Sequence, residues 1–211
     1  MFFFPLIVGI WNLQKVHTLQ CLECTPDTFG SCTETTKECP SQYHQCASAR
    51  LVMFLEGTKF PGIDAKSCAL AEVCVDGSFN FGATKGVYKT KCCSGELCNN
   101  YTVSDSDSTP NGKKCFSCVG QDCNRTLNCE GNEDHCIKAT MNVGGNSQTM
   151  KGCASELVCS DKLSTVLNQF KGLELNSGIE CCQGDYCNSA IKTSASLPLL
   201  LVPLSYVVWF Y

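Results

Sequence analysis

Hydrophobic residues are concentrated at the two ends of the chain, while the long middle part mixes short apolar and polar runs. Near the N-terminus, Phe2–Leu13 is an apolar run of the size found in secretory signal peptides, although no Lys or Arg precedes it. Val16 and Thr18 fit the small-residue positions of a cleavage site, which would start the mature chain near Leu19. We therefore predict a signal peptide over residues 1–18, with an uncleaved membrane anchor as the alternative.

The second hydrophobic run lies at the C-terminal end. Leu197–Tyr211 holds fifteen largely apolar residues, whereas a membrane-spanning helix needs about 20. The small residues Asn188, Ser189 and Ala190 precede this run, separated from it by a polar spacer, Ile191–Ser196. This order is typical of a signal for glycosylphosphatidylinositol (GPI) attachment, in which the tail is removed. We predict attachment at Asn188, with Ser189 as second choice; a short single-span anchor is the alternative.

Between the ends, the hydrophobic pattern predicts short strands and a small all-β fold. Gly144 and Gly145 separate two strand-like segments, as in a tight hairpin turn. Apolar residues within Ser160–Gly172 recur at helical spacing, so this segment is the candidate for a short helix. The segments with strand-like composition are Gln45–Phe54, Phe81–Cys92, His135–Val143 and Asn146–Cys153.

Cysteine spacing shows that one pattern occurs twice. The gaps between the first ten cysteines are 3, 8, 7, 7, 22, 6, 18, 1 and 5, and those between the last ten are 3, 5, 6, 7, 17, 6, 22, 1 and 5. Five of the nine gaps agree, and the endings CCSGELCNN and CCQGDYCNS share further residues. The chain is therefore predicted to contain two copies of one module.

The boundary between the copies is a polar, turn-rich segment. We predict module 1 over residues 19–102, a flexible linker over 103–112, module 2 over 113–188 and the GPI-attachment signal over 189–211. Modules of this size have a marginal hydrophobic core. Disulfides would compensate, because each bridge contributes on the order of 2 to 4 kcal/mol.

Twenty cysteines point to an oxidising compartment, since a reducing cytosol would keep them as thiols. Spacing alone does not fix the pairing. The adjacent residues Cys92 and Cys93 are too constrained for an ordinary bridge to each other, whereas a bridge from Cys93 to Cys98 closes easily. The formal net charge of -4 gives no indication of a nucleic-acid partner.

The two copies resemble LU domains, the lymphocyte antigen 6 and urokinase-receptor family of three-finger folds. The motifs that carry the resemblance are Cys21–Cys24 (CLEC) with Cys93–Asn99 (CSGELCN), and Cys115–Cys118 (CFSC) with Cys182–Asn188 (CQGDYCN). The resemblance spans nearly all of the predicted mature chain. It implies a disulfide-rich all-β protein made of two tandem three-finger domains.

The resemblance also implies roles for particular residues. Asn99 and Asn188 look like the family's structural asparagine, which hydrogen-bonds back into the disulfide hub. The implied disulfides of module 1 are Cys21–Cys46, Cys24–Cys32, Cys39–Cys68, Cys74–Cys92 and Cys93–Cys98. Those implied for module 2 are Cys115–Cys136, Cys118–Cys123, Cys129–Cys153, Cys159–Cys181 and Cys182–Cys187.

Other chemistry has little support in the sequence. The CxxC motifs at Cys21 and Cys115 lack the context of redox or zinc sites, so we expect structural disulfides and no metal or cofactor. Catalysis is not expected, because His44 and His135 accompany no recognisable nucleophile motif. Asn100 and Asn124 begin N-glycosylation triplets, and we expect both to carry glycans in an exported protein.

The resemblance implies a receptor-like binding protein of the urokinase-receptor type, held on the outer face of the plasma membrane by a GPI anchor. Its partner would be an extracellular protein that contacts the finger loops. The chain also resembles gamma-type phospholipase A2 inhibitors, so a secreted inhibitor-like binding protein is the alternative. Apolar finger residues would either anchor the partner or fill the seam between the modules. These residues are Phe54, Leu55, Phe60, Phe79, Phe81, Leu163, Leu167 and Phe170.

Overall fold

The structure, a computed structural model, describes residues 18–27, 30–104, 109–119, 121–143, 146–167 and 178–189. The predicted signal-peptide run, the apolar tail, the Gly144-Gly145 turn and Phe170 lie outside these residues. Among the helices of the described ranges, none combines the length and the hydrophobicity that a membrane crossing requires. The described residues form a mostly β, disulfide-rich fold, in agreement with the predicted class.

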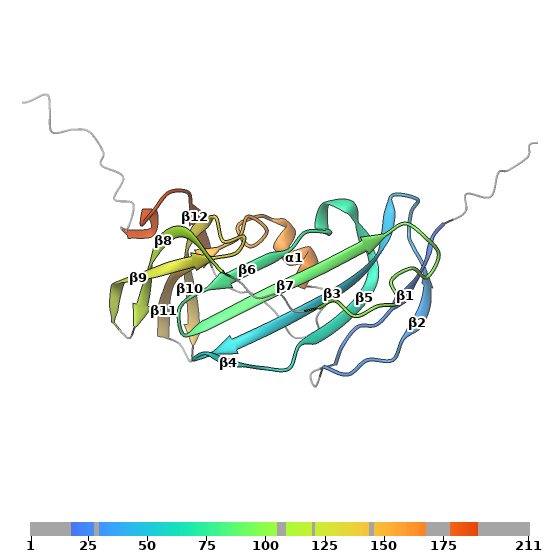
Figure 1. The fold of residues 1–211 in the computed structure, drawn as a ribbon, viewed down its shortest axis with the longest axis horizontal. Coiled ribbons are helices and arrows are strands. Elements are labelled where there is room, and N and C mark those ends of the chain that lie inside the picture. Colours follow the sequence, from blue (N-terminus) through green and yellow to red (C-terminus); the bar gives the residue numbers. More distant parts are fainter. Residues whose placement is uncertain are drawn as a thin grey trace, which may run out of the picture.

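Module 1 is a set of antiparallel strands that run along the long axis of the molecule (Figure 1). Its longest strand, β3, pairs with β7 along one side and with β5 and β4 along the other. A separate two-stranded ribbon, β1–β2, lies at one end. The elements are β1 (Gln20–Glu23), β2 (Thr35–Glu38), β3 (His44–Leu55), β4 (Thr58–Lys59), β5 (Ile63–Leu70), the 3-10 helix η1 (Ala71–Val73), β6 (Gly77–Asn80) and β7 (Thr84–Cys93).

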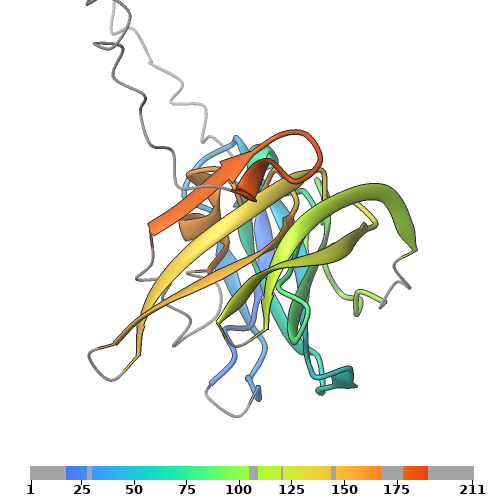
Figure 2. The ribbon, with the colours of Figure 1, turned by 90° about the vertical axis from the view of Figure 1, so that its left-hand side faces the viewer.

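Module 2 repeats this plan of antiparallel strands. Its hairpins β8–β9 and β10–β11 extend in the same direction from the hub (Figure 2). The central strand β10 pairs with both β11 and β12. The elements are β8 (Pro110–Val119), β9 (Asp122–Glu130), β10 (His135–Val143), β11 (Asn146–Ala154), α1 (Lys162–Leu167), β12 (Gly178–Cys182) and the 3-10 helix η2 (Cys187–Ser189).

The strands expected from the sequence are present, with differences at their ends. The strand expected over Phe81–Cys92 begins later, as β7, because Phe81 N–H donates to the Thr84 carbonyl and closes a turn in which Gly82 has a φ of 86°. Pro110–Gly112, assigned to the linker from the sequence, belong to β8. The helix expected within Ser160–Gly172 is present as α1.

The two modules share one β-sheet. Strands β11 and β6 pair at Cys153–Asn80 and Ala154–Phe79, which makes an eight-stranded sheet from both halves of the chain. Just past the pairing, Ser155 N–H donates to the Ser78 carbonyl at 2.9 Å, and Ser78 N–H donates to Ser155 Oγ at 2.9 Å. We call this junction the module seam.

Apolar side chains cross the module seam in both directions. Leu157 and Val166 of module 2 pack into the core of module 1, beside Leu51 and Tyr88. Phe79 and Phe81 of module 1 pack against the module 2 core of Ile137, Ala154 and Val158. Neither module therefore buries its apolar face alone, and the seam is a hydrophobic core as well as a strand pairing.

Candidate binding surface

Two disulfide hubs hold the fingers in place. The described residues contain ten disulfides and no free cysteine, and each bridge joins a pair that the family resemblance implies. Buried cysteines form the centre of each hub, such as Cys21, Cys39 and Cys46 in module 1. A cysteine in a disulfide has no free thiolate for redox or metal chemistry. The cysteines of both CxxC motifs are therefore parts of structural disulfides in this structure.

A buried asparagine closes each hub by bonding to backbone groups of other strands. Asn99 Oδ1 accepts from Leu22 N–H at 3.0 Å, and Asn99 Nδ2 donates to the Leu22 and Ala47 carbonyls, both at 2.9 Å. Asn188 Oδ1 accepts from Phe116 N–H at 3.0 Å. Asn188 Nδ2 donates to the carbonyls of Phe116, Ile137 and Gly152 at 3.0, 3.0 and 3.3 Å. These contacts tie the C-terminal end of each module to its first and central strands.

Among the finger residues whose exposure the structure describes, two exposed apolar side chains lie on or directly after the hairpin of β3 and β4. Leu55 is 50% exposed and Phe60 is 46% exposed. Glu56 and Gly57 form the two-residue turn, with φ values of 50° and 79°. Positive φ at both positions is the signature of a type I′ hairpin, for which glycine is the favoured second residue. We call Phe54, Leu55 and Phe60 the finger tip.

The finger tip is held rigidly by its neighbours. Glu56 N–H donates to the Ala83 carbonyl at 2.7 Å, and Phe60 N–H donates to the Met53 carbonyl at 2.9 Å. Lys85 Nζ lies 5.6 Å from the centre of the Phe54 ring, within the range of a cation–π contact. Because the backbone is fixed, binding a partner here would cost little ordering entropy.

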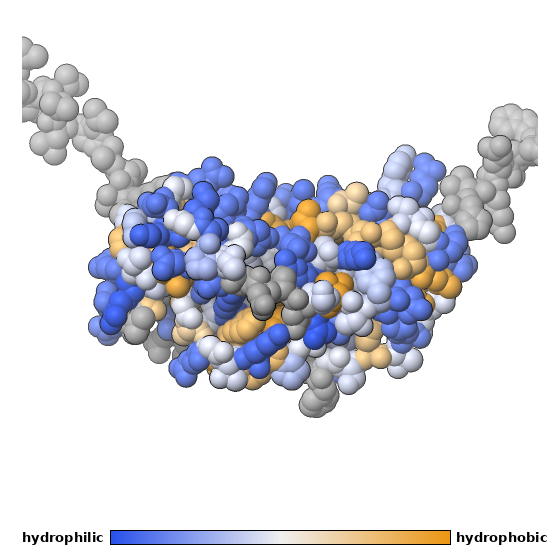
Figure 3. Space-filling model, viewed as in Figure 1, coloured by the Kyte–Doolittle hydropathy of each residue, from blue (hydrophilic) through white to orange (hydrophobic). Residues whose placement is uncertain are grey.

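The structure divides the apolar finger residues between the two roles considered from the sequence. Phe79, Phe81 and Leu163 pack against the seam core of module 2. Leu55 and Phe60 stay in contact with solvent. Apolar residues are visible along the course of β3 and β7, whereas the end formed by β8 and β9 is mostly hydrophilic (Figure 3). Among the described finger residues named from the sequence, the two that are exposed, Leu55 and Phe60, belong to module 1.

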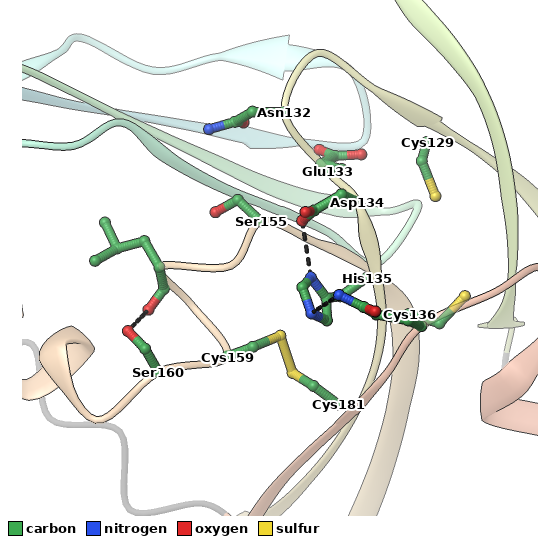
Figure 4. Close-up of polar contacts among 12 residues, drawn as sticks. Cys129, Asn132, Glu133, Asp134, His135, Cys136, Ser155, Cys159, Ser160 and Cys181 are labelled. Carbon is green, nitrogen blue, oxygen red and sulfur yellow. Dashed lines mark hydrogen bonds and ion pairs between the residues drawn. A yellow bond between two sulfur atoms is a disulfide. The ribbon is translucent and has the colours of Figure 1, made fainter.

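The histidines have local hydrogen-bond partners. His135 Nδ1 lies 2.8 Å from Asp134 Oδ1, as shown in Figure 4, and His135 Nε2 lies 3.2 Å from Gln183 Nε2. His44 Nδ1 lies 2.8 Å from the Ser41 hydroxyl, a contact within one turn that the sequence did not suggest. In the part of the chain that the structure describes, no carboxylate hydrogen-bonds to His44, so this pair lacks the orienting third group of a hydrolytic triad.

The residues predicted for glycosylation and lipid attachment differ in their exposure. Asn100 and Asn124 are both exposed, Asn124 on strand β9. Ser189 is exposed, while Asn188 beside it is buried.

A polar turn at the module seam was not singled out from the sequence. Residues 130–133, at the end of β9 and in the turn that leads to β10, line a groove of about 520 Å³ together with residues of β7. Within this turn, Glu133 is fully buried. In the sequence, this turn appears only as four polar residues that follow Gly131, and polar runs of this kind usually lie in solvent.

Comparison with known proteins gives consistent matches over both halves. The family model for the u-PAR/Ly-6 domain matches residues 17–101 and again residues 111–190. The urokinase plasminogen activator surface receptor of Mus musculus is 31% identical over 187 residues, covering 81% of this chain and 55% of the receptor. The chain thus spans about half the length of that receptor.

Relatives of a second kind match over most of their own length. A phospholipase A2 inhibitor of the gamma type from Laticauda semifasciata is 28% identical over 158 residues, covering 67% of this chain and 84% of the inhibitor. Among solved structures, the crystal structure of mouse TEX101 matches with 15% identity and a TM-score of 0.27, covering 81% of this chain and 98% of that chain. With both halves matched by one family model and a relative above 30% identity, this chain belongs to the u-PAR/Ly-6 domain family.

Proposed function

We propose that the protein is a binding protein of the cell surface, which engages an extracellular protein ligand through the finger tip and has no catalytic role. The observation that carries this proposal is the pair of exposed apolar side chains, Leu55 and Phe60, on a hairpin fixed by a disulfide hub. Rigid, solvent-exposed apolar anchors are what protein interfaces use to gain affinity. Relatives named as a receptor and as inhibitors fit the same mode of action.

We further propose that the mature chain carries a GPI anchor, and the hub geometry bears on the attachment residue. Asn188 is buried, and its amide makes four hydrogen bonds that close module 2. Ser189 is exposed and follows directly. An enzyme that exchanges the backbone at this position needs access to it, so Ser189 is the better candidate of the two. The exposed residues Asn100 and Asn124 are proposed to carry N-glycans, which would keep partners away from those surfaces.

The test of ligand engagement compares tip variants with a matched control. Leu55→Ala and Phe60→Ala each remove one exposed anchor, and truncating such an anchor costs about 1 to 2 kcal/mol of binding free energy. A captured extracellular ligand should therefore bind each variant roughly 5 to 30 times more weakly. Tyr43→Ala is the control, because Tyr43 is 73% exposed but precedes the opposite end of β3. Equal loss of affinity for the control and the tip variants would contradict the proposed surface.

A secreted inhibitor-like protein is the second candidate, since the match covers 84% of the Laticauda semifasciata inhibitor. Treatment of intact expressing cells with a phosphatidylinositol-specific phospholipase C distinguishes an anchored protein from a secreted one. Release of the protein by the enzyme supports the anchor. Protein that accumulates in the medium of untreated cells without a lipid supports the secreted alternative.

A further inference from the structure

The turn between β9 and β10 places polar groups of module 2 in hydrogen-bonding contact with module 1. Asn132 Nδ2 donates to the Asp76 carbonyl at 3.0 Å, and the Ser78 hydroxyl donates to Asn132 Oδ1 at 2.8 Å. Lys85 of β7 forms an ion pair with Glu130 at the end of β9. Asn132, Glu133 and Asp134 lie in sequence along this turn in Figure 4. The turn is thus a polar contact that adds to the strand pairing of the module seam.

Within this contact, Glu133 is a carboxyl group with incomplete hydrogen bonding. Its exposed fraction is 0%, and its Oε2 accepts from Glu130 N–H at 2.8 Å. Its Oε1 is buried and has no hydrogen-bond partner among the described residues, because the nearby Ser78 hydroxyl donates to Asn132 instead. A charged carboxylate held in this way loses hydration that the protein does not replace.

The charged groups around Glu133 offset this cost only in part. Lys85 on β7 attracts the negative charge of Glu133, but Lys85 is paired with Glu130, which repels that charge. Asp76, which also lines the groove, pairs with Lys89 on β7. Next to Glu133 in the chain, Asp134 pairs with His135 on β10. Burial raises the pKa of Glu133 to about 7, against the lowering effects of the Glu130 backbone N–H and Lys85.

We propose that Glu133 makes the module seam proton-dependent, so that the two modules hold together more tightly when this carboxyl group is protonated than when it is charged. The protonated group needs no compensating cation, whereas the charged group is stabilised by opening of the seam, which lets water reach it. The seam is therefore strongest in acidic compartments and weaker at the neutral pH outside the cell. This inference depends on the seam alone and not on the proposed ligand or anchor.

The direction and size of the effect follow from proton linkage. The pKa of Glu133 in the closed seam, about 7, exceeds its ordinary value of 4.5. The stabilising contribution is complete below pH 4.5 and is lost as pH rises toward 7 and above. For an open state in which Glu133 has its ordinary pKa, the ratio of open to closed seams rises about 70-fold between pH 5 and pH 8.

Hydrogen exchange at the amides of Ser78 and Ser155 measures this ratio, because both amides bond across the seam. The protein is expressed from the full-length chain and purified in its mature form, and exchange is followed from pH 5 to pH 8 after correction for intrinsic rates. The unchanged protein should show the roughly 70-fold rise in opening. Glu133→Gln should show less than about a threefold rise, because the amide mimics the protonated acid. Glu156→Gln, a change of an exposed glutamate beside the seam, should behave like the unchanged protein.

Two results would overturn the proposal. One is a seam opening that does not change with pH in the unchanged protein; the other is a Glu133→Gln variant with the full pH dependence. Because a folding defect in Glu133→Gln would obscure this comparison, a second measurement uses the unchanged protein only. A carbon-13 NMR titration of the Glu133 side-chain carboxyl should give a midpoint near 7, and a midpoint at the ordinary value of 4.5 would refute the inference.

Discussion

Gly152 should control whether the two modules stay joined, because β11 passes very close to β6 at this residue. A Cβ atom added to Gly152 would lie 1.9 Å from the Asn80 carbonyl oxygen and 3.0 Å from Phe81 Cα. Carbon and oxygen atoms normally approach to about 3.3 Å. In Gly152→Ala, the strands must therefore separate by more than about 1 Å, since the atoms in the way belong to backbone and not to a movable side chain.

The free-energy cost of Gly152→Ala follows from the contacts at the seam. Overpacking a close contact costs about 1 to 3 kcal/mol. Two hydrogen bonds between Ser78 and Ser155, each at 2.9 Å, would stretch beyond bonding distance and add about 1 kcal/mol each. The free energy that holds the seam closed should thus fall by roughly 3 to 5 kcal/mol. The five disulfides of each module keep the hubs folded.

Hydrogen exchange with mass spectrometry tests this expectation. In Gly152→Ala, the amides of Ser78 and Ser155 should exchange at least about 100 times faster, and the hub amides of Cys24 and Lys66, which bond each other's carbonyls, should be unchanged. Gly178→Ala is the matched control, because a Cβ at Gly178 meets nothing within 4 Å. Full protection of the seam amides in Gly152→Ala would refute the reasoning.

Two further predictions concern the hubs. Asn99→Ala removes three hydrogen bonds and leaves buried backbone groups unpaired, so the free energy of unfolding in urea should fall by about 3 kcal/mol or more; a loss below about 1 kcal/mol would contradict the closing role of Asn99. Replacing Cys118 and Cys123 by serine should cost about 1.6 kcal/mol less than replacing Cys39 and Cys68, because the first bridge spans 5 residues and the second spans 29. Equal thermal destabilisation of the two double variants would argue against loop entropy as the source of the stabilisation by these disulfides.

Much of this architecture could be predicted from the sequence, because cysteine spacing constrains a small domain strongly. The repeated ending CC-x4-CN identified the module type, and the family resemblance then supplied the pairings seen in the ten disulfides. Strands β3, β10 and β11 were found through their composition. Their ends were less certain, because turns such as Phe81–Thr84 depend on single hydrogen bonds.

A seam between the modules was considered from the sequence, but the residues that form it could not be identified, because they depend on contacts between positions far apart in the chain. Phe79 and Leu55 have equally apolar side chains, yet one packs against module 2 and the other faces solvent. The pairing of β11 with β6 decides between these roles, and no periodicity in either strand encodes it. Glu133 was missed for a similar reason, since an acidic turn is normally solvated, whereas here Ser78 and Lys85 of module 1 lie beside the buried carboxyl group.

Leu157 and Val166 of module 2 complete the hydrophobic core of module 1, and this has a consequence for biosynthesis. The disulfide-bearing part of module 1 ends at Cys98, but its apolar interior is complete only after synthesis has passed Val166. At about 5 to 20 residues per second, this interval lasts roughly 3 to 14 s, during which Leu51 and Tyr88 remain uncovered. If the chain is exported as proposed above, chaperones of the secretory pathway would meet this open face on each nascent chain. A shortened product that stopped after Tyr101 would keep it permanently and would be a target for retention rather than a smaller working protein.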